Sequence, residues 1–309
     1  PMLVNRWRNS DFPLERTGAA GIIPLNRNGG GNVTGPSRKP SIFIAALALL
    51  AFMRVAPATA EATLPPESDP AARGLAIAEE MDRRDSGWGD AKARMKMVLT
   101  NAAGDTSERE LQFTMLEVTE ANEGDWSLMV FDEPRDIEGT ALLTHAHVGE
   151  PDDQWLYLPA VKRVKRISSS NKSGPFVGSE FAFEDLAAQE VGKFTYQWLR
   201  DEPCGERNCH VIERTPAYEG SGYTRQVVWI DTTDYLPRKT DYYDRKDALL
   251  KTLTFGEYDS YLDGIWRPRE LDMVNHETDK KTKLIWEEYE FRTGLTESDF
   301  STSSLERAR

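Results

Sequence analysis

The sequence predicts a mainly β protein, built as a single antiparallel sheet that curls on itself around an apolar cavity. Three observations predict this fold. From Trp88 onward, apolar and polar residues alternate with period two, and short turns rich in Gly, Asp, Asn or Pro join most of the segments. Only one amphipathic helical segment precedes this series, and no helices alternate with the strands. Many strand side chains are bulky, which favours a curled sheet that encloses a cavity.

The first sixty residues are not expected to belong to this sheet. An apolar run over residues 41–53 follows two basic residues and precedes an A-x-A motif at residues 58–60, as in a secretory signal peptide. A buried helix of the mature fold is the alternative, and the run is short for a membrane span of about 20 apolar residues. We therefore expect residues 1–60 to be removed and residues 61–309 to form one periplasmic domain. No cysteine follows the motif directly, so no lipid anchor is expected.

The predicted mature chain is strongly acidic. The whole sequence has a formal net charge of −13 at pH 7, and residues 1–60 contain seven of its 38 Lys and Arg but only two of its 51 Asp and Glu. Residues 61–309 therefore have a formal charge of −18. Such a chain is repelled by a phosphate backbone, so we expect no nucleic acid among its partners.

The elements follow from their residue patterns in chain order. Residues 70–85 place Leu75, Ala78 and Met81 at helical spacing among charged residues, which predicts one amphipathic helix. The strands are interrupted once, over residues 168–189, where a Ser/Gly/Pro loop precedes a short helical segment, FAFEDLA. The predicted strands cover residues 92–100, 109–116, 125–131, 140–146, 154–159, 163–167, 193–200, 209–215, 225–231, 236–244, 249–259, 265–275 and 282–291.

Two cysteines, Cys204 and Cys209, lie in a predicted turn between two strands. The expected compartment is oxidising, which favours a local disulfide over two free thiols. A metal site is not expected here, because only His210 stands nearby and a structural zinc site needs four ligands.

Two short motifs are weak candidates for catalysis. Residues 169–172 match the S-x-x-K arrangement of penicillin-binding enzymes, but the match lies in a loop and its companion motifs are missing. Glu184 and Asp185 are adjacent, so they point in different directions and make a poor acid–base pair. The sequence has no glycine-rich phosphate loop, nucleophile elbow or HExxH motif, and no cofactor is expected.

A histidine pair is a candidate metal site. His145 and His147 share one face of a predicted strand, and with Asp152 and Asp153 nearby they have the residue types that bind zinc. The same two histidines are equally explained as polar residues at the rim of the sheet.

Bulky side chains on the strands are candidates for the wall of the cavity. For any single residue, packing in an ordinary filled core is the alternative. The predicted cavity residues are Met95, Met97, Phe113, Leu128, Trp155, Tyr157, Phe194, Trp198, Trp229, Phe255 and Trp266.

Four cations, Lys162, Arg163, Lys165 and Arg166, occupy five consecutive positions directly after an apolar strand. We call these four residues the basic strip. In a strand, Arg163 and Lys165 share one face and Arg166 lies on the other, so the four cannot all contact one ligand. We interpret the strip as a contact for lipid head groups or for a membrane surface. The alternative is a charged edge strand that discourages aggregation.

Long stretches of the chain resemble one bacterial family. The run DDQWLYLPAVKRVKRISSSNKSGPFVGSEFAFEDL resembles the hallmark block of the outer membrane lipoprotein-sorting protein family, and RGLAIAEEMDRRDSGWGD, SGYTRQVVWID and MVNHETDKKTKLIW are similar to other segments of it. The resemblance spans about residues 72–306. It implies an unclosed β-barrel like that of the carriers LolA and LolB, with a helical lid over an apolar cavity that receives acyl chains. It also implies a periplasmic role and a partner among RND-type inner-membrane exporters.

These inferences predict a carrier that binds lipid or lipoprotein acyl chains, docks transiently on membranes and moves its cargo toward the outer membrane. An enzyme built on the same barrel and acting on a hydrophobic substrate is the alternative. A structural partner of an envelope transporter is a third interpretation.

Overall fold

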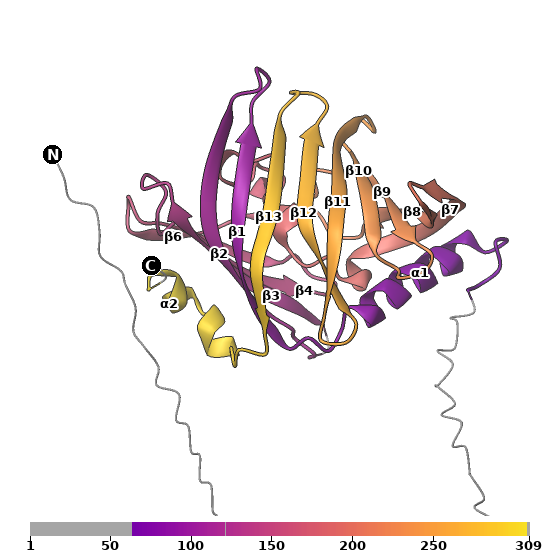
Figure 1. The fold of residues 1–309 in the computed structure, drawn as a ribbon, viewed down its shortest axis with the longest axis horizontal. Helices are drawn as coiled ribbons and strands as arrows, with labels where there is room; N and C mark the ends of the chain where they lie inside the picture. The colour runs from indigo at the N-terminus through magenta and orange to yellow at the C-terminus, as the bar shows by residue number, and fades with distance from the viewer. Residues whose placement is uncertain (1–63, 121, 308–309) are drawn as a thin grey trace, which may run out of the picture. The chain divides into compact units, whose positions relative to one another are not determined.

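The computed structural model describes residues 64–120 and 122–307, so the predicted extension and signal peptide lie outside the described residues. In the described part of the chain, one long helix precedes a single sheet of thirteen strands (Figure 1). The helical segments are α1 (Pro70–Arg84), η1 (Ser169–Asn171), η2 (Phe176–Gly178), η3 (Phe183–Leu186), η4 (Val191–Lys193), η5 (Glu297–Phe300) and α2 (Thr302–Leu305). The strands are β1 (Asp90–Thr100), β2 (Thr106–Leu116), β3 (Glu123–Glu133), β4 (Ala141–His147), β5 (Asp153–Leu158), β6 (Arg163–Arg166), β7 (Phe194–Cys204), β8 (Arg207–Pro216), β9 (Arg225–Asp231), β10 (Pro237–Tyr243), β11 (Leu249–Tyr261), β12 (Ile265–Asn275) and β13 (Lys281–Phe291).

The sheet consists of two antiparallel meanders joined in the middle. Its strand order is β6-β5-β4-β3-β2-β1-β13-β12-β11-β10-β9-β8-β7. The first and last strands of the chain, β1 and β13, pair in a register that sets Met95 opposite Trp286 and Met97 opposite Leu284. β6 and β7 form the two edges, so the sheet curls without closing (Figure 1). The predicted mainly β, unclosed antiparallel fold is confirmed.

The strand order forces one long connection. β6 and β7 follow each other in the chain but lie at opposite edges of the sheet, so residues 167–193 must pass from one edge to the other. We call residues 167–193 the crossing segment. Its aromatic side chains Phe176, Phe181 and Phe183 are buried in one core with inward-facing residues of both meanders, among them Met97 and Leu284. The crossing segment therefore fills much of the hollow of the curled sheet.

Buried polar contacts anchor the crossing segment. The Lys251 ammonium on β11 pairs with Asp185 at 2.8 Å and donates to the Glu180 carbonyl at 3.0 Å. The Glu184 carboxylate accepts hydrogen bonds from Ser221 Oγ and the Gly222 amide, both at 2.8 Å. Glu184 and Asp185 thus point to different partners, as their adjacency predicts, and both hold the segment in place.

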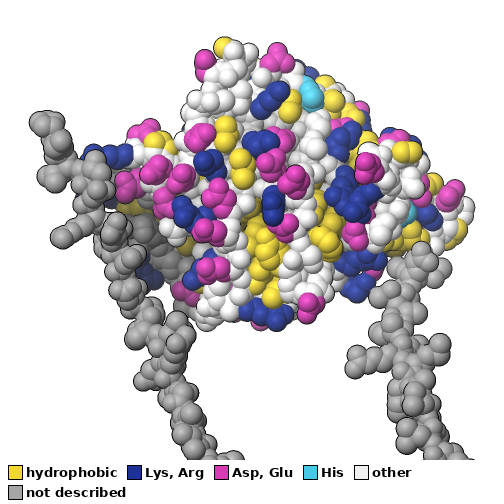
Figure 2. All heavy atoms as spheres, viewed as in Figure 1, with side chains coloured by type: hydrophobic (Ala, Val, Ile, Leu, Met, Phe, Trp, Pro, Cys, Tyr) yellow, Lys and Arg dark blue, Asp and Glu magenta, His cyan; other side chains and the backbone are white. Residues whose placement is uncertain are grey.

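Period-two alternation sorts charged and apolar side chains between the faces. On β1, Met95 and Met97 point into the core, whereas Arg94 and Lys96 lie on the outer face. The outer cations pair across strands, for example Lys96 with Glu108 at 3.5 Å. This face carries interspersed basic and acidic side chains (Figure 2). Each exposed pair stabilises the fold by only about 0–1 kcal/mol, so the apolar inner face dominates the stability.

Helix α1 is well capped and packs closely on the β7 edge. Asp69 caps its start by accepting from the Ala72 amide at 3.1 Å, and Pro70 follows at the first helical position. A Cβ at Gly74 would lie 2.8 Å from the Trp198 backbone nitrogen, so only glycine allows this approach. Ile77 and Ala78 are buried against side chains of β7, β8 and β9. The predicted helix at residues 70–85 is confirmed.

The C-terminal residues cover part of the outer face. Phe300 and Leu305, from η5 and α2, are fully buried against Val130, Ala141 and Leu143 of β3 and β4. This region of the sheet therefore has apolar side chains on both faces.

No helix in residues 64–120 and 122–307 combines the length and the apolar character needed to cross a bilayer.

Candidate ligand-binding site

A cavity of about 880 Å³ lies between the C-terminal end of α1 and the β9–β10 and β11–β12 turns. This volume is within the range of roughly 300–1,000 Å³ that is typical of small-molecule sites. The interior behind it is occupied by the crossing segment, whose residues Ala188, Gln189 and Glu190 form part of the cavity wall.

One side of the cavity is apolar and aromatic. Trp88 and Ile265 are buried together and pack against Met115 of β2. Phe255 of β11 and Trp266 of β12 also line the cavity. These residues are brought together because the turn before β1 and the ends of β2, β11 and β12 meet at the same end of the sheet.

Carboxylates from several elements also line the cavity. Asp82 and Asp85 come from the end of α1, Glu117 follows β2, Asp125 is on β3, and Glu190 precedes η4. Burial, reinforced by the charges of Glu190 and Glu117, raises the pKa of Asp125 to about 7, although the Val118 amide donates to its carboxylate. Partial desolvation also raises the pKa of Asp82, Asp85 and Glu190. Acidic groups from several elements therefore line a partly apolar cavity.

Three arginines line the same cavity, and each already has a partner in the chain. Arg83 and Arg84 both pair with Glu80 at 2.7 Å, and Arg84 also lies over the Tyr235 ring at 4.4 Å. Arg267 pairs with Asp85 and stacks near Trp88. Each of these three guanidinium groups therefore already forms an ion pair with a carboxylate of the chain.

The structure distributes the eleven predicted cavity residues over four places. Phe255 and Trp266 line the cavity. Met95, Met97 and Phe113 lie in the core that the crossing segment fills. Phe194 and Trp198 pack in the cluster that α1 covers.

The other four predicted cavity residues do not face the hollow of the sheet. Leu128, Trp155 and Tyr157 pack in the outer cluster that contains Phe300 and Leu305. Trp229 is paired with Lys239, whose ammonium lies 3.5 Å from its ring, and its Nε1 donates to Glu202 at 2.6 Å. Its neighbours Val228 and Ile230 point into the inner cluster, so Trp229 lies on the outer face.

The basic strip lies on the β6 edge and contributes no residue to the cavity wall. Strand pairing places Lys165 opposite Leu156 and Arg166 opposite Trp155, so the strip is divided between the two faces of the sheet. Arg166 forms an ion pair with Asp153. Within residues 64–120 and 122–307, Lys162, Arg163 and Lys165 make no ion pair. A head-group or membrane contact for the strip stays a prediction.

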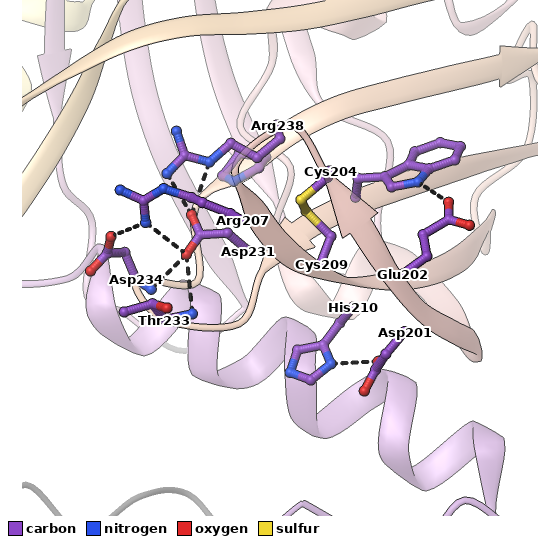
Figure 3. The surroundings of a disulfide bond; sticks show 12 residues. Asp201, Glu202, Cys204, Arg207, Cys209, His210, Asp231, Thr233, Asp234 and Arg238 are labelled. Carbon is purple, nitrogen blue, oxygen red and sulfur yellow. Dashed lines mark hydrogen bonds and ion pairs between the residues drawn. A yellow bond between two sulfur atoms is a disulfide. The ribbon is translucent and has the colours of Figure 1, made fainter.

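Cys204 and Cys209 form a disulfide across the β7–β8 turn, with their Cα atoms 5.8 Å apart (Figure 3). Next to it, His210 Nδ1 lies 2.7 Å from Asp201 on the neighbouring strand (Figure 3). The fully buried Asp231 accepts from Arg238 at 2.6 Å. The end of the β7–β8 hairpin is therefore held by the disulfide and by the His210–Asp201 pair, and the neighbouring β9–β10 turn is held by the Asp231–Arg238 ion pair.

The remaining candidates have structural partners. His145 stacks on Trp126 with ring centroids 3.9 Å apart, and its Nε2 lies 2.7 Å from the Phe300 carbonyl oxygen. His147 Nδ1 lies 2.8 Å from Glu123. In the described part of the chain, no three His, Cys, Asp or Glu side chains are arranged to hold a metal ion. Lys172 of the S-x-x-K match is buried and donates to the Asp152 carbonyl at 2.5 Å.

Known proteins share this sequence and fold. A family model described as an uncharacterized protein matches residues 123–307. An outer membrane lipoprotein-sorting protein domain from Vibrio parahaemolyticus is 51% identical over 77% of this chain and 100% of that domain, with a TM-score of 0.75. This chain belongs to the outer membrane lipoprotein-sorting protein family. No curated protein matches it significantly.

Two further solved structures are similar to the present chain. A DUF1329 family protein from Desulfovibrio piger ATCC 29098 is 30% identical over 77% of this chain and 99% of that protein, with a TM-score of 0.72. A LolA superfamily protein from Nitrosomonas europaea has the same fold, with 21% identity over 75% of this chain and 98% of that protein and a TM-score of 0.61. The similarity to LolA and LolB expected from the sequence is therefore confirmed at the level of the fold.

Several residues that line the cavity in the present chain were not predicted from the sequence, notably Trp88, Asp85, Asp125 and Glu190. Asp85 and Trp88 lie in the connection between α1 and β1, whereas Asp125 is on β3 and Glu190 is in the crossing segment, so only the tertiary structure brings these three parts together. The sequence did contain one local signal, because Trp88 is a large aromatic residue that stands between two glycines. The structure shows that its side chain is buried. The carboxylates had no such signal, because acidic residues are frequent throughout the chain.

Proposed function

We propose that this protein is a periplasmic carrier that binds lipid or lipoprotein acyl chains and moves them toward the outer membrane. The observation that carries the proposal is a cavity walled by Trp88, Phe255 and Trp266 in a sheet of the LolA superfamily fold. Burying an aromatic or aliphatic group there is worth about 1.5–3 kcal/mol, so a few such contacts hold an acyl chain reversibly. The relatives are named as lipoprotein-sorting or LolA superfamily proteins, which favours a carrier over an enzyme.

The acyl chain is proposed to enter the cavity rather than the centre of the curled sheet. Phe176 and Phe181 of the crossing segment already pack against the inward-facing side chains at the centre. The cavity leaves about 880 Å³ unfilled, and the last turn of α1 forms one of its walls. In this proposal α1 acts as the lid that the family resemblance implies.

The basic strip is proposed to orient the carrier at an anionic membrane. Its cations are exposed on a sheet edge, and each exposed cation near an anionic bilayer is worth about 1 kcal/mol. Such attraction is transient, as a carrier requires. An RND-type inner-membrane exporter is the partner proposed to supply the cargo.

Lipid binding is tested with two matched tryptophan variants. Trp266→Ala removes an indole side chain that lines the cavity, whereas Trp229→Ala removes an indole side chain from the outer face of the sheet. We expect Trp266→Ala to weaken binding of the neutral fluorescent probe N-phenyl-1-naphthylamine at least about tenfold, because an aromatic contact worth about 1.5–3 kcal/mol is lost. Trp229→Ala should bind as the parent does. Mass spectrometry of organic extracts from the native protein should also reveal co-purifying lipid.

Parental binding by Trp266→Ala, with the variant folded, would place the site elsewhere. Absence of any probe binding and of any co-purifying lipid would overturn the carrier proposal.

A further inference from the structure

We propose that the cavity selects its cargo by head-group charge and accepts amphiphiles whose head carries a positive charge, such as a protonated amine or a quaternary ammonium. Anionic amphiphiles of the same chain length are discriminated against. This inference rests on the proposed function, because it concerns the same cavity, and it names the class of ligand that the cavity holds.

Apolar and acidic side chains line the same cavity. Trp88, Met115 and Trp266 supply apolar surface, and Asp82, Glu117 and Asp125 supply carboxylates. A ligand that contacts both surfaces needs an apolar chain and a head that interacts favourably with carboxylates. A simple metal ion would leave the apolar wall unused.

The fold fixes the carboxylates of the cavity in place. Glu117 accepts hydrogen bonds from the amides of Gly87 and Gly89, at 2.5 and 2.6 Å. Glu190 accepts from the Asp125 amide at 3.1 Å, and Asp125 accepts from the Val118 amide at 3.1 Å. These neutral amides orient the carboxylates without cancelling their charge. These carboxylates are therefore held in fixed positions before a ligand binds.

The chain supplies little positive charge to compensate these carboxylates. Of the three arginines in the wall, only Arg267 pairs with a carboxylate of the cavity, Asp85. In the described part of the chain, Asp82, Glu117, Asp125 and Glu190 make no ion pair. Burial, together with the nearby charges of Glu190 and Glu117, raises the pKa of Asp125, as expected for a carboxylate without a cationic partner. A cationic head group relieves this repulsion, whereas an anionic one adds to it.

The test compares two amphiphiles of equal chain length, dodecyltrimethylammonium and laurate. Each displaces the neutral fluorescent probe N-phenyl-1-naphthylamine from the full chain at pH 8 and low salt, below the concentration at which micelles form. We expect the ammonium compound to displace the probe at a concentration at least tenfold lower than laurate. In Asp125→Asn with Glu190→Gln, the ratio should fall to near one; because the ratio compares two competitors in the same variant, any change in affinity for the neutral probe cancels.

A charge-matched control separates local from general electrostatics. Glu108→Gln with Glu110→Gln removes two carboxylates from β2, at positions outside the cavity wall, and should keep the parental ratio. Equal displacement by the two amphiphiles in the parent, or stronger displacement by laurate, overturns the charge selection but leaves the carrier proposal intact. Failure of the parent to bind the neutral probe overturns the carrier proposal itself. An equal fall of the ratio in the control variant would show that only net charge matters.

Discussion

At the scale of single residues, the site depends on carboxylates that the fold holds at a cost to its own stability. Asp125 is the clearest case, because burial and nearby Glu190 and Glu117 raise its pKa from 3.8 to about 7. A carboxyl group with a raised pKa binds its proton more tightly in the folded chain than in the unfolded chain. The stability that it contributes is therefore present at low pH and falls as the pH rises from about 4 to about 7.

Asp125→Asn should remove this pH dependence. Asparagine keeps an oxygen that can accept from the Val118 amide but cannot ionise. We expect the variant to be more stable than the parent at pH 8, by on the order of 2 kcal/mol, and about equally stable at pH 4. Urea unfolding at the two pH values measures the difference. A variant that is less stable than the parent at both pH values would show that the carboxylate is stabilising.

Gly74 illustrates a residue whose role is purely geometric. The absence of a side chain lets α1 approach the β7 backbone, because an added Cβ would lie within 3 Å of Trp198 and Gln197 main-chain atoms. Glycine in a helix interior costs about 1 kcal/mol relative to alanine. The close packing of Ile77 and Ala78 on the sheet offsets that cost.

At the scale of elements, the two sheet edges are protected in different ways. Helix α1 packs beside β7, whereas the four-residue β6 carries charge. Short length and exposed cations both discourage a second sheet from pairing with this edge. Protection of the edge and attraction to an anionic membrane are compatible roles for the same side chains.

Replacing all four strip cations by glutamine tests the membrane role. We expect weaker binding to vesicles that contain anionic lipid, and we expect parental binding to fade as salt shortens the Debye length from about 10 Å at 0.1 M to about 3 Å at 1 M. Folding should change little, since exposed substitutions usually alter stability by less than about 0.5 kcal/mol.

The matched control neutralises four other cations of the sheet, and vesicle sedimentation at low salt compares the two variants. These control residues are Lys92, Arg94, Lys96 and Lys283. If the strip variant sediments with vesicles as strongly as the parent, the strip serves only to protect the edge.

At the scale of the whole molecule, the curled sheet and the crossing segment form one core. The segment links strands at opposite edges and contacts both meanders, so it cannot detach without exposing buried aromatic side chains. Its buried ion pair between Lys251 and Asp185 should therefore affect global stability rather than a local loop.

Lys251→Met should destabilise the protein by about 3–5 kcal/mol, because it leaves the Asp185 charge buried without its partner. Adding Asp185→Asn to this variant should restore part of the loss by removing that charge. Thermal unfolding of the parent, the single variant and the double variant measures both effects. If the single variant unfolds at the parental temperature, the segment is not part of the cooperative core.

The sequence by itself determined the class of fold, because strand and helix periodicity are local properties. Alternation along residues such as Arg94, Met95, Lys96 and Met97 is visible without any partner strand, and the spacing of residues 70–85 identifies the helix in the same way. Family membership was likewise evident, because the segment from Asp152 to Leu186 is long and distinctive.

Only the tertiary structure decided which apolar faces enclose a cavity. Periodicity shows that Trp155, Tyr157 and Met97 are on apolar faces, but it cannot tell what covers each face. The C-terminal residues Phe300 and Leu305 cover the first two from outside, and the crossing segment fills the space around Met97. The cavity is the space that remains between elements far apart in the chain. Its composition therefore depends on how the sheet curls and on where the crossing segment and α1 pack, which no local pattern contains.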